Sequence, residues 1–155
     1  MKKTINRRSF LSNSALAGAG LLVVPRHVLG GKGFTAPSDK LNIAAIGSGG
    51  MGAGNLSRVE AENIVALCDV DFKQAAGTFK KYPKAPQYKD FRVMLEKEKS
   101  IDAVIVATPD HTHAAAAMAA IRLGKHVYVQ KPLTHSVYEA RTLTEAVREY
   151  KVISQ

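Results

Sequence analysis

The chain has 155 residues, 46% of them apolar, and a formal net charge of +9 at pH 7. This length allows one domain with a substantial hydrophobic core. Five of the nine net charges lie in residues 1–30, which contain no acid, whereas acids and bases are interspersed over the remaining residues. Such a mixed surface argues against nucleic acid as a partner.

The amino terminus has the pattern of an export signal. A basic segment, Lys2–Arg8, precedes a short apolar run, Leu16–Val24. This run is too short to span a bilayer, so the pattern predicts a signal peptide over residues 1–30 and no stable membrane anchor. Asn6–Ser12, NRRSFLS, resembles a twin-arginine translocation signal, which implies the twin-arginine export machinery as a partner and a periplasmic or extracellular location. The alternative is a cytoplasmic basic tail.

Residues 31–40 are predicted to form a linker, and an alternation of apolar strands and amphipathic helices begins after it. The predicted strands are Leu41–Ile46, Asn63–Asp69, a short one within Ala85–Lys89, Ile101–Ala107, His126–Gln130 and the beginning of a sixth in Lys151–Ser154. The predicted helices are Met51–Val59, Phe72–Tyr82, Phe91–Lys97, Thr112–Leu123 and Val137–Tyr150.

This alternation predicts an α/β fold over residues 41–155, a Rossmann-type doubly wound parallel sheet in a three-layer αβα arrangement. Residues with capping side chains stand before three of the helices, and a glycine follows another. We expect Asp71, Asp90 and Ser136 to cap helix starts and Gly124 to end a helix.

A glycine-rich turn follows the first strand. Gly47, Gly49 and Gly52 fit the pattern G-x-G-x-x-G, in which the glycines allow a tight turn, a close approach to a pyrophosphate and close helix–strand packing. The pattern predicts a dinucleotide site; an ordinary strand–helix turn is the alternative. The predicted cofactor contacts here are Gly47, Ser48, Gly49, Gly50, Met51 and Gly52.

An acid ends the second strand. Asp69 follows the first motif glycine at the spacing typical of the carboxylate that holds the adenosine ribose. A carboxylate accepts hydrogen bonds from both ribose hydroxyls and repels a 2′-phosphate, and Val70 follows where an arginine could attract that phosphate. The sequence therefore favours NAD over NADP. A helix cap is the alternative role for Asp69, although Asp71 is better placed for it.

Two further polar segments follow the fourth and fifth strands, at the edge where open α/β sheets bind ligands. Thr108–His113, TPDHTH, can reach the nicotinamide half of the cofactor, and no metal site is expected there because no second ligand cluster exists. Lys131 follows the fifth strand and is predicted to face the reacting end of the cofactor; an ordinary surface lysine is the alternative.

These motifs together resemble the amino-terminal domain of the Gfo/Idh/MocA oxidoreductases. The resemblance covers residues 41–155 and rests on GSGGMG, CDVD, ATPDHTHA and YVQKPLTHS. It implies that Lys131 is catalytic and contacts the cofactor, and that Thr108, Pro109, His113 and Gln130 lie on the nicotinamide side. Gln130 replaces the glutamate of the family's E-K-P motif, and Asp110 stands where many members have asparagine.

The resemblance also implies a second, carboxyl-terminal domain that supplies the substrate pocket, further catalytic residues and often an oligomer interface. We therefore expect the cofactor half of an enzyme that transfers hydride between a sugar or polyol and tightly bound NAD, homo-oligomeric at full length. Some relatives are NAD-dependent glycosidases, which gives one alternative. Another is that the 155 residues alone bind the nucleotide without activity.

Overall fold

The computed structural model describes residues 35–155, so the signal peptide predicted for residues 1–30 lies outside the described residues. The 3-10 turn η1, Pro37–Asp39, precedes a compact unit formed by Leu41–Gln155. Within residues 35–155, no helix is both long enough and apolar enough to cross a bilayer.

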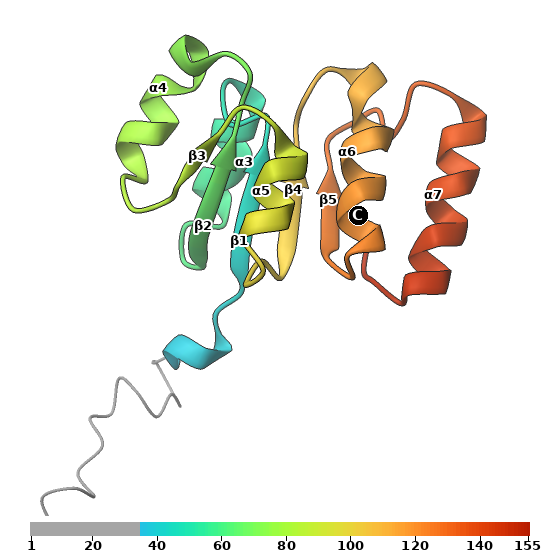
Figure 1. Ribbon diagram of the computed structural model, residues 1–155, viewed down its shortest axis with the longest axis horizontal. Helices are drawn as coiled ribbons and strands as arrows, with labels where there is room; N and C mark the ends of the chain where they lie inside the picture. The colour runs from blue at the N-terminus through green and yellow to red at the C-terminus, as the bar shows by residue number, and fades with distance from the viewer. Residues whose placement is uncertain (1–34) are drawn as a thin grey trace, which may run out of the picture. The chain divides into compact units, whose positions relative to one another are not determined.

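The unit is built on a parallel sheet with the strand order β3-β2-β1-β4-β5 (Figure 1). From β1 the chain first builds outward to β2 and β3 and then crosses back to place β4 on the other side of β1. This reversal beside β1 is the switch point at which open α/β sheets bind ligands. The strands are β1 (Asn42–Ile46), β2 (Asn63–Cys68), β3 (Gln87–Tyr88), β4 (Ala103–Val106) and β5 (His126–Val129).

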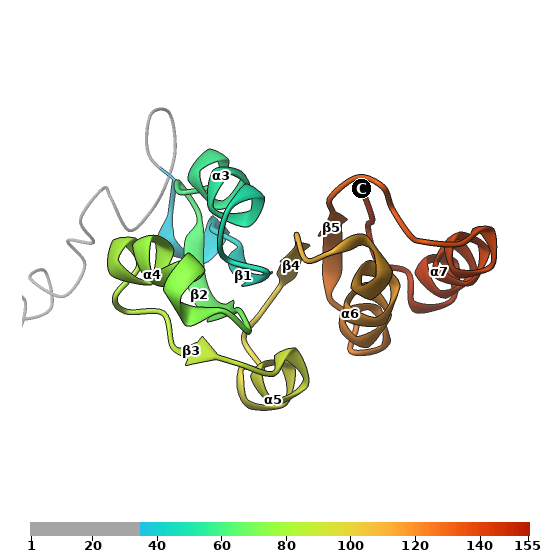
Figure 2. The same ribbon diagram turned by 90° about the horizontal axis from the view of Figure 1, so that it is seen from above.

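Helices cover both faces of the sheet, which confirms the predicted Rossmann-type three-layer fold. Seen from above, α3 lies on one side of the sheet, and α5 and α6 lie on the other (Figure 2). Side chains of α3 and α4 share one buried cluster, and those of α5, α6 and α7 share another. The helices are α3 (Met51–Arg58), α4 (Phe72–Lys81), α5 (Phe91–Lys97), α6 (Asp110–Arg122) and α7 (Val137–Tyr150).

Side chains along β1 point alternately to the two faces of the sheet and so contribute to both core clusters. Ile43 and Ala45 belong to the cluster with α3 and α4, whereas Ala44 and Ile46 belong to the cluster with α5, α6 and α7. Successive side chains of a strand point to opposite faces, so a strand covered on both sides must be apolar throughout. This is why β1 has no polar residue after Asn42.

The predicted helix caps are present. Asp71 accepts hydrogen bonds from the backbone of Lys73 and Gln74 at the start of α4, and Asp90 accepts one from Arg92 at the start of α5. Ser136 and Glu139 form a reciprocal capping box at α7. Gly124 follows α6 with a φ of 71°, a left-handed conformation that glycine adopts without strain.

The structure corrects several predicted boundaries. The strands β1, β2, β4 and β5 are shorter than predicted by one or two residues at one or both ends, and α6 begins at Asp110 instead of Thr112. The predicted sixth strand is reduced to a single parallel bridge between Ser154 and Val127. Lys151 cannot begin a strand because it caps the end of α7 with a φ of 53°, in the left-handed region.

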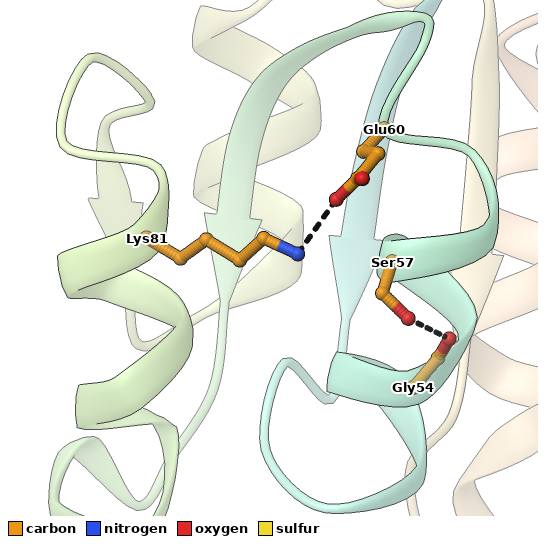
Figure 3. Close-up of polar contacts among 4 residues, drawn as sticks. All are labelled: Gly54, Ser57, Glu60 and Lys81. Atoms are coloured by element: carbon orange, nitrogen blue, oxygen red, sulfur yellow. Dashed lines mark hydrogen bonds and ion pairs between the residues drawn. The ribbon is translucent and has the colours of Figure 1, made fainter.

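An exposed contact joins the end of α4 to the turn after α3. Lys81 donates a hydrogen bond to Glu60 over 2.7 Å, and both side chains are about half exposed (Figure 3). Solvent screens such a pair, so it contributes little to stability. In the same view, Ser57 donates to the carbonyl oxygen of Gly54 within α3. A Cβ on Gly54 would meet no atom within 4 Å.

Candidate functional site

The glycine turn lies between β1 and α3 and touches the end of β4. Gly47 has a φ of 84°, and a Cβ there would lie 2.6 Å from the carbonyl oxygen of Ala107. A Cβ on Gly52 would lie 1.7 Å from the carbonyl oxygen of Gly47. Both positions therefore require glycine, one for the turn itself and one for the close packing of α3 against it.

Glycine is favoured at the other two positions of the turn, Gly50 and Gly49, for two different reasons. Gly50, the residue that precedes α3, has a φ of 49°, again in the left-handed region. A Cβ on Gly49 would lie 3.0 Å from the Cγ of Gln74 on α4. The missing side chain at Gly49 thus lets the turn approach α4 closely, a constraint that the motif alone does not reveal.

The carboxylate of Asp69 holds the glycine turn from the end of β2. Its Oδ2 accepts hydrogen bonds from the backbone N–H groups of Ser48, over 2.8 Å, and Gly49, over 2.9 Å. Its Oδ1 accepts one from the N–H of Asp71 over 2.9 Å. Asp69 is therefore not the cap of α4, which is Asp71, and its carboxylate is fixed at the rim of the turn with further lone pairs available to a ligand.

A cavity of about 550 Å³ opens at this edge of the sheet, within the size range of small-molecule and cofactor sites. Seven of the predicted contacts line it: Gly47, Gly49, Gly50, Met51, Asp69, Thr108 and Pro109. The other lining residues are Ile46, Cys68, Val70, Asp71, Gln74, Lys89, Phe91, Ala107, His111 and Thr112.

Two of the helices that start beside this cavity, α3 and α6, have no side-chain cap. The residues that precede α3 and α6 are Gly50 and Pro109, and neither provides a capping side chain. The three other helices of the unit are capped by Asp71, Asp90 and Ser136. Uncapped helix starts present free N–H groups and a positive dipole end, which is a favourable environment for an anion.

Ser48 and Gly52 were predicted to contact the cofactor, but they do not line the cavity. Ser48 is completely buried, and its hydroxyl donates to the carbonyl oxygen of Cys68 over 3.1 Å. Its own carbonyl oxygen accepts a hydrogen bond from the hydroxyl of Thr78 over 2.7 Å. Ser48 thus fastens the turn to β2 and α4, and Gly52 packs α3 against the turn.

Cys68 lines the cavity as an uncharged thiol. Burial raises the pKa of this thiol from 9.0 to about 12, and the nearby carboxylates of Asp69 and Asp90 add to the effect. The thiol therefore stays protonated at neutral pH and contributes an apolar surface to the cavity instead of a nucleophile.

A second polar cluster lies where β4 and β5 end. His113 is 1% exposed, with Nδ1 at 2.7 Å from the carbonyl oxygen of Pro132 and Nε2 at 2.7 Å from that of Thr108. The Oε1 of Gln130 accepts a hydrogen bond from the backbone N–H of Lys131 over 2.8 Å. Lys131 itself is exposed, and its peptide bond to Pro132 is cis.

This second cluster is distinct from the lining of the cavity. His113, Gln130 and Lys131 were predicted to contact the cofactor, and none of the three is among the cavity's lining residues. They lie at the same edge of the sheet, because β4 and β5 are parallel neighbours whose carboxyl ends coincide. Gln130 uses its amide oxygen as an acceptor for Lys131, a role that the oxygen of a glutamate could also perform.

Sequence reasoning missed two cavity residues that come from the segment after β3. Lys89 and Phe91 follow this short strand and line the cavity, and the ammonium nitrogen of Lys89 lies 5.4 Å from the ring centroid of Phe72. The rule that parallel strands end at one edge could have found them, since β3 pairs with β2 in the same sheet.

Comparison with known proteins decides the family. The model of an oxidoreductase family with an NAD-binding Rossmann fold, Gfo/Idh/MocA, matches residues 41–155. The chain belongs to the Gfo/Idh/MocA family. Residues 41–155 are therefore its NAD-binding domain, and NAD is the cofactor that this domain binds.

Among Gfo/Idh/MocA relatives, an inositol 2-dehydrogenase of Rubrobacter xylanophilus is 33% identical in a match 113 residues long that covers 70% of this chain and 32% of the relative. A glycosyl hydrolase family 109 protein of Solibacter usitatus is 34% identical over 156 residues, covering 90% of this chain and 35% of the relative. The chain thus spans about a third of the length of these relatives.

A similar solved structure is that of GenD2 from gentamicin A biosynthesis in complex with NAD. It has a TM-score of 0.69 and 27% sequence identity, and the match covers 85% of this chain and 36% of GenD2. The likeness extends over most of the described sheet and helices.

Proposed function

We propose that the protein carrying this Gfo/Idh/MocA domain oxidises a hydroxyl group of a sugar or polyol with NAD. The observation that supports this most directly is the pairing of two features at one sheet edge. The cavity lined by the glycine turn and Asp69 suits a dinucleotide, and Lys131 lies exposed after the neighbouring strand β5. The inositol 2-dehydrogenase relatives support a polyol as the substrate class.

The residues around the cavity fit NAD in charge and in shape. The uncapped start of α3 suits the pyrophosphate, because the glycines leave its N–H groups unobstructed. Asp69 suits the adenosine ribose, since its carboxylate is fixed by three N–H groups and still has lone pairs to accept from hydroxyls. Thr108 and Pro109 line the cavity where the nicotinamide half would extend toward β5.

Bound NAD supplies the acceptor for the hydride that leaves the substrate carbon. In this proposal Lys131 orients the substrate hydroxyl by hydrogen bonding and helps to relay its proton. Gln130 supports this arrangement by accepting a hydrogen bond from the backbone of Lys131. The remaining catalytic groups and the substrate pocket would come from the part of the protein that corresponds to the other two thirds of the relatives.

The test is a Lys131→Ala substitution in the full-length protein. Loss of a positioned proton-transfer group should lower kcat for inositol-dependent NAD reduction by about 100-fold or more. Lys97→Ala, which removes an exposed lysine on α5, is the matched control and should leave kcat unchanged. A turnover near wild type in the Lys131→Ala variant would contradict this role.

For the amino terminus, we propose that residues 1–30 direct twin-arginine export, supported by Arg7, Arg8, Phe10 and Leu11 of NRRSFLS. The protein would then work in the periplasm or outside the cell with NAD bound before export and retained through turnover. Fractionation of cells that express wild type or an Arg7→Lys, Arg8→Lys variant tests the export. Equal amounts of both proteins outside the cytoplasm would refute it, and processed protein without bound nucleotide would refute retention.

The similarity to glycosyl hydrolase family 109 proteins favours a second candidate function, an NAD-dependent glycosidase that uses the same cofactor site. Such an enzyme would oxidise the sugar transiently and reduce it again, so NADH would not accumulate. Release of free sugar from an aryl glycoside without net NADH formation would favour this candidate. NADH formation with inositol and no glycoside cleavage would favour the dehydrogenase.

A further inference from the structure

His113 bridges two segments that the chain brings together from different strands. The residue lies in the first turn of α6, and its ring is buried between the segment that follows β4 and the segment that follows β5. On one side it contacts the carbonyl oxygen of Thr108 and on the other that of Pro132, each over 2.7 Å. The second contact is one residue away from Lys131.

The chemistry of these contacts is directional. A carbonyl oxygen only accepts hydrogen bonds, so the ring of His113 donates through whichever nitrogen carries hydrogen, and each ring nitrogen lies at hydrogen-bond distance from a carbonyl oxygen. The burial of the ring excludes water as a competing partner and strengthens such bonds. His113 therefore holds the backbone beside Lys131 at a defined distance from Thr108, which lines the cavity.

The other contacts that hold Lys131 come from its immediate neighbour Gln130. Its backbone N–H donates to the side chain of Gln130, its immediate neighbour, and its side chain is exposed. The backbone of Gln130 is tied to β4 by a hydrogen bond from its N–H to the carbonyl oxygen of Val106. After Gln130, the contact from His113 to Pro132 ties the segment to α6 and the loop after β4.

We propose that His113 is a positioning residue that fixes the Lys131–Pro132 segment so that Lys131 faces the reacting end of the bound cofactor. This inference rests on the proposed role of Lys131. In this role His113 holds the backbone next to Lys131 and does not contact NAD directly. A misplacement of about 1 Å at a reacting group can cost about 100-fold in rate, so the effect of losing this contact is measurable.

The first experiment is a double-mutant cycle in the full-length protein with His113→Phe and Lys131→Ala. His113→Phe keeps a ring of similar size and removes the two ring nitrogens that contact the carbonyl oxygens, and it should lower kcat by about 10- to 100-fold while the KM for NAD changes less than about threefold. Because His113 acts through Lys131, His113→Phe should have little further effect in the Lys131→Ala background. The same loss in both backgrounds would overturn the proposal.

His113→Gln provides a more conservative variant, since its amide can donate to one of the two carbonyl oxygens, and it should recover part of the lost kcat. His135→Phe is the matched control because His135 is exposed and its ring has no hydrogen-bond partner among residues 35–155. This control should retain wild-type kcat. A His113→Gln variant no better than His113→Phe would count against the bridging contacts.

A measurement on the folded chain separates this inference from the proposed reaction. In amide NMR spectra, His113→Phe should shift the signals of Lys131, Leu133 and Thr108 while those of β1 and β2 stay unchanged. Unchanged signals at Lys131 and Leu133 would overturn the positioning role whatever the activity. These local shifts, together with an absence of oxidoreductase turnover by the full-length wild-type protein, would refute the proposed reaction and leave the bridge standing.

Discussion

The contact between Gly52 and the glycine turn predicts opposite effects for two substitutions in one helix. In Gly52→Ala, the new Cβ would lie 1.7 Å from the carbonyl oxygen and 2.9 Å from the carbonyl carbon of Gly47. The obstacle is backbone, so no side chain can rotate away. In Gly54→Ala, two residues further along α3, the new Cβ meets no atom within 4 Å. The two variants share the same helix and the same chemical change.

The two substitutions are expected to change the free energy of unfolding in opposite directions. Alanine in place of glycine inside a helix stabilises by about 1 kcal/mol, which is the whole effect expected for Gly54→Ala. For Gly52→Ala, an overlap with tightly packed backbone costs about 3 kcal/mol, the upper end for overpacked sites. Subtracting the helix contribution leaves a net loss of about 2 kcal/mol, so the variants should differ by about 3 kcal/mol.

Urea unfolding followed by far-ultraviolet circular dichroism measures both values, and titration calorimetry with NAD measures binding. Gly52→Ala should lower the midpoint by about 1 M urea and weaken NAD binding, because α3 must move away from the turn. Gly54→Ala should raise the midpoint and leave NAD binding unchanged. If the Gly52→Ala variant is as stable as the Gly54→Ala variant, α3 does not pack against the turn as closely as described.

Two further substitutions and two treatments test three separate parts of the structure. Asp69→Asn should weaken NAD binding about tenfold and narrow the preference over NADP, because it removes the charge that repels a 2′-phosphate; an unchanged preference in calorimetry would contradict this. Burial raises the pKa of the Cys68 thiol to about 12, so iodoacetamide at pH 8 should alkylate it only after unfolding, and rapid labelling of the folded protein would refute its burial. The free energy of unfolding should also fall as pH rises above 9, since the thiol then ionises only in the unfolded chain. Ser136→Ala removes the capping box of α7 and should cost about 1 kcal/mol in urea unfolding with no effect on NAD binding.

Much of the fold could be predicted because local signals and tertiary environment agree. The strands β1, β2 and β4 are continuous apolar runs, as strands covered on both faces must be, and Asp71, Asp90 and Ser136 mark helix starts by a local hydrogen bond. The predicted sixth strand begins later than expected, for a local reason that the apolar pattern does not contain. Lys151 adopts a left-handed backbone to end α7, so backbone pairing with β5 begins only at Ile153.

Part of the candidate site could likewise be predicted from the sequence, and part could not. The glycines and Asp69 could be predicted to lie together because the motif fixes their backbone geometry and their spacing. The contacts of Ser48 and His113 could not, because they join segments distant in sequence: Ser48 bonds to β2 and α4, and His113 bonds to the segment after β5. A polar residue in a motif can serve the ligand or the protein, and only its three-dimensional partners distinguish the two.

NMR mapping of NAD binding on the chain itself tests the assigned cofactor site. Binding should be saturable, and the amide signals of Gly49, Gly50, Met51 and Asp69 should shift most, with smaller shifts at Thr108 and at Lys131. The same titration of Gly52→Ala should show weaker binding. Absence of binding at about 1 mM NAD, or shifts centred away from the glycine turn, would contradict the assignment of the cavity to NAD.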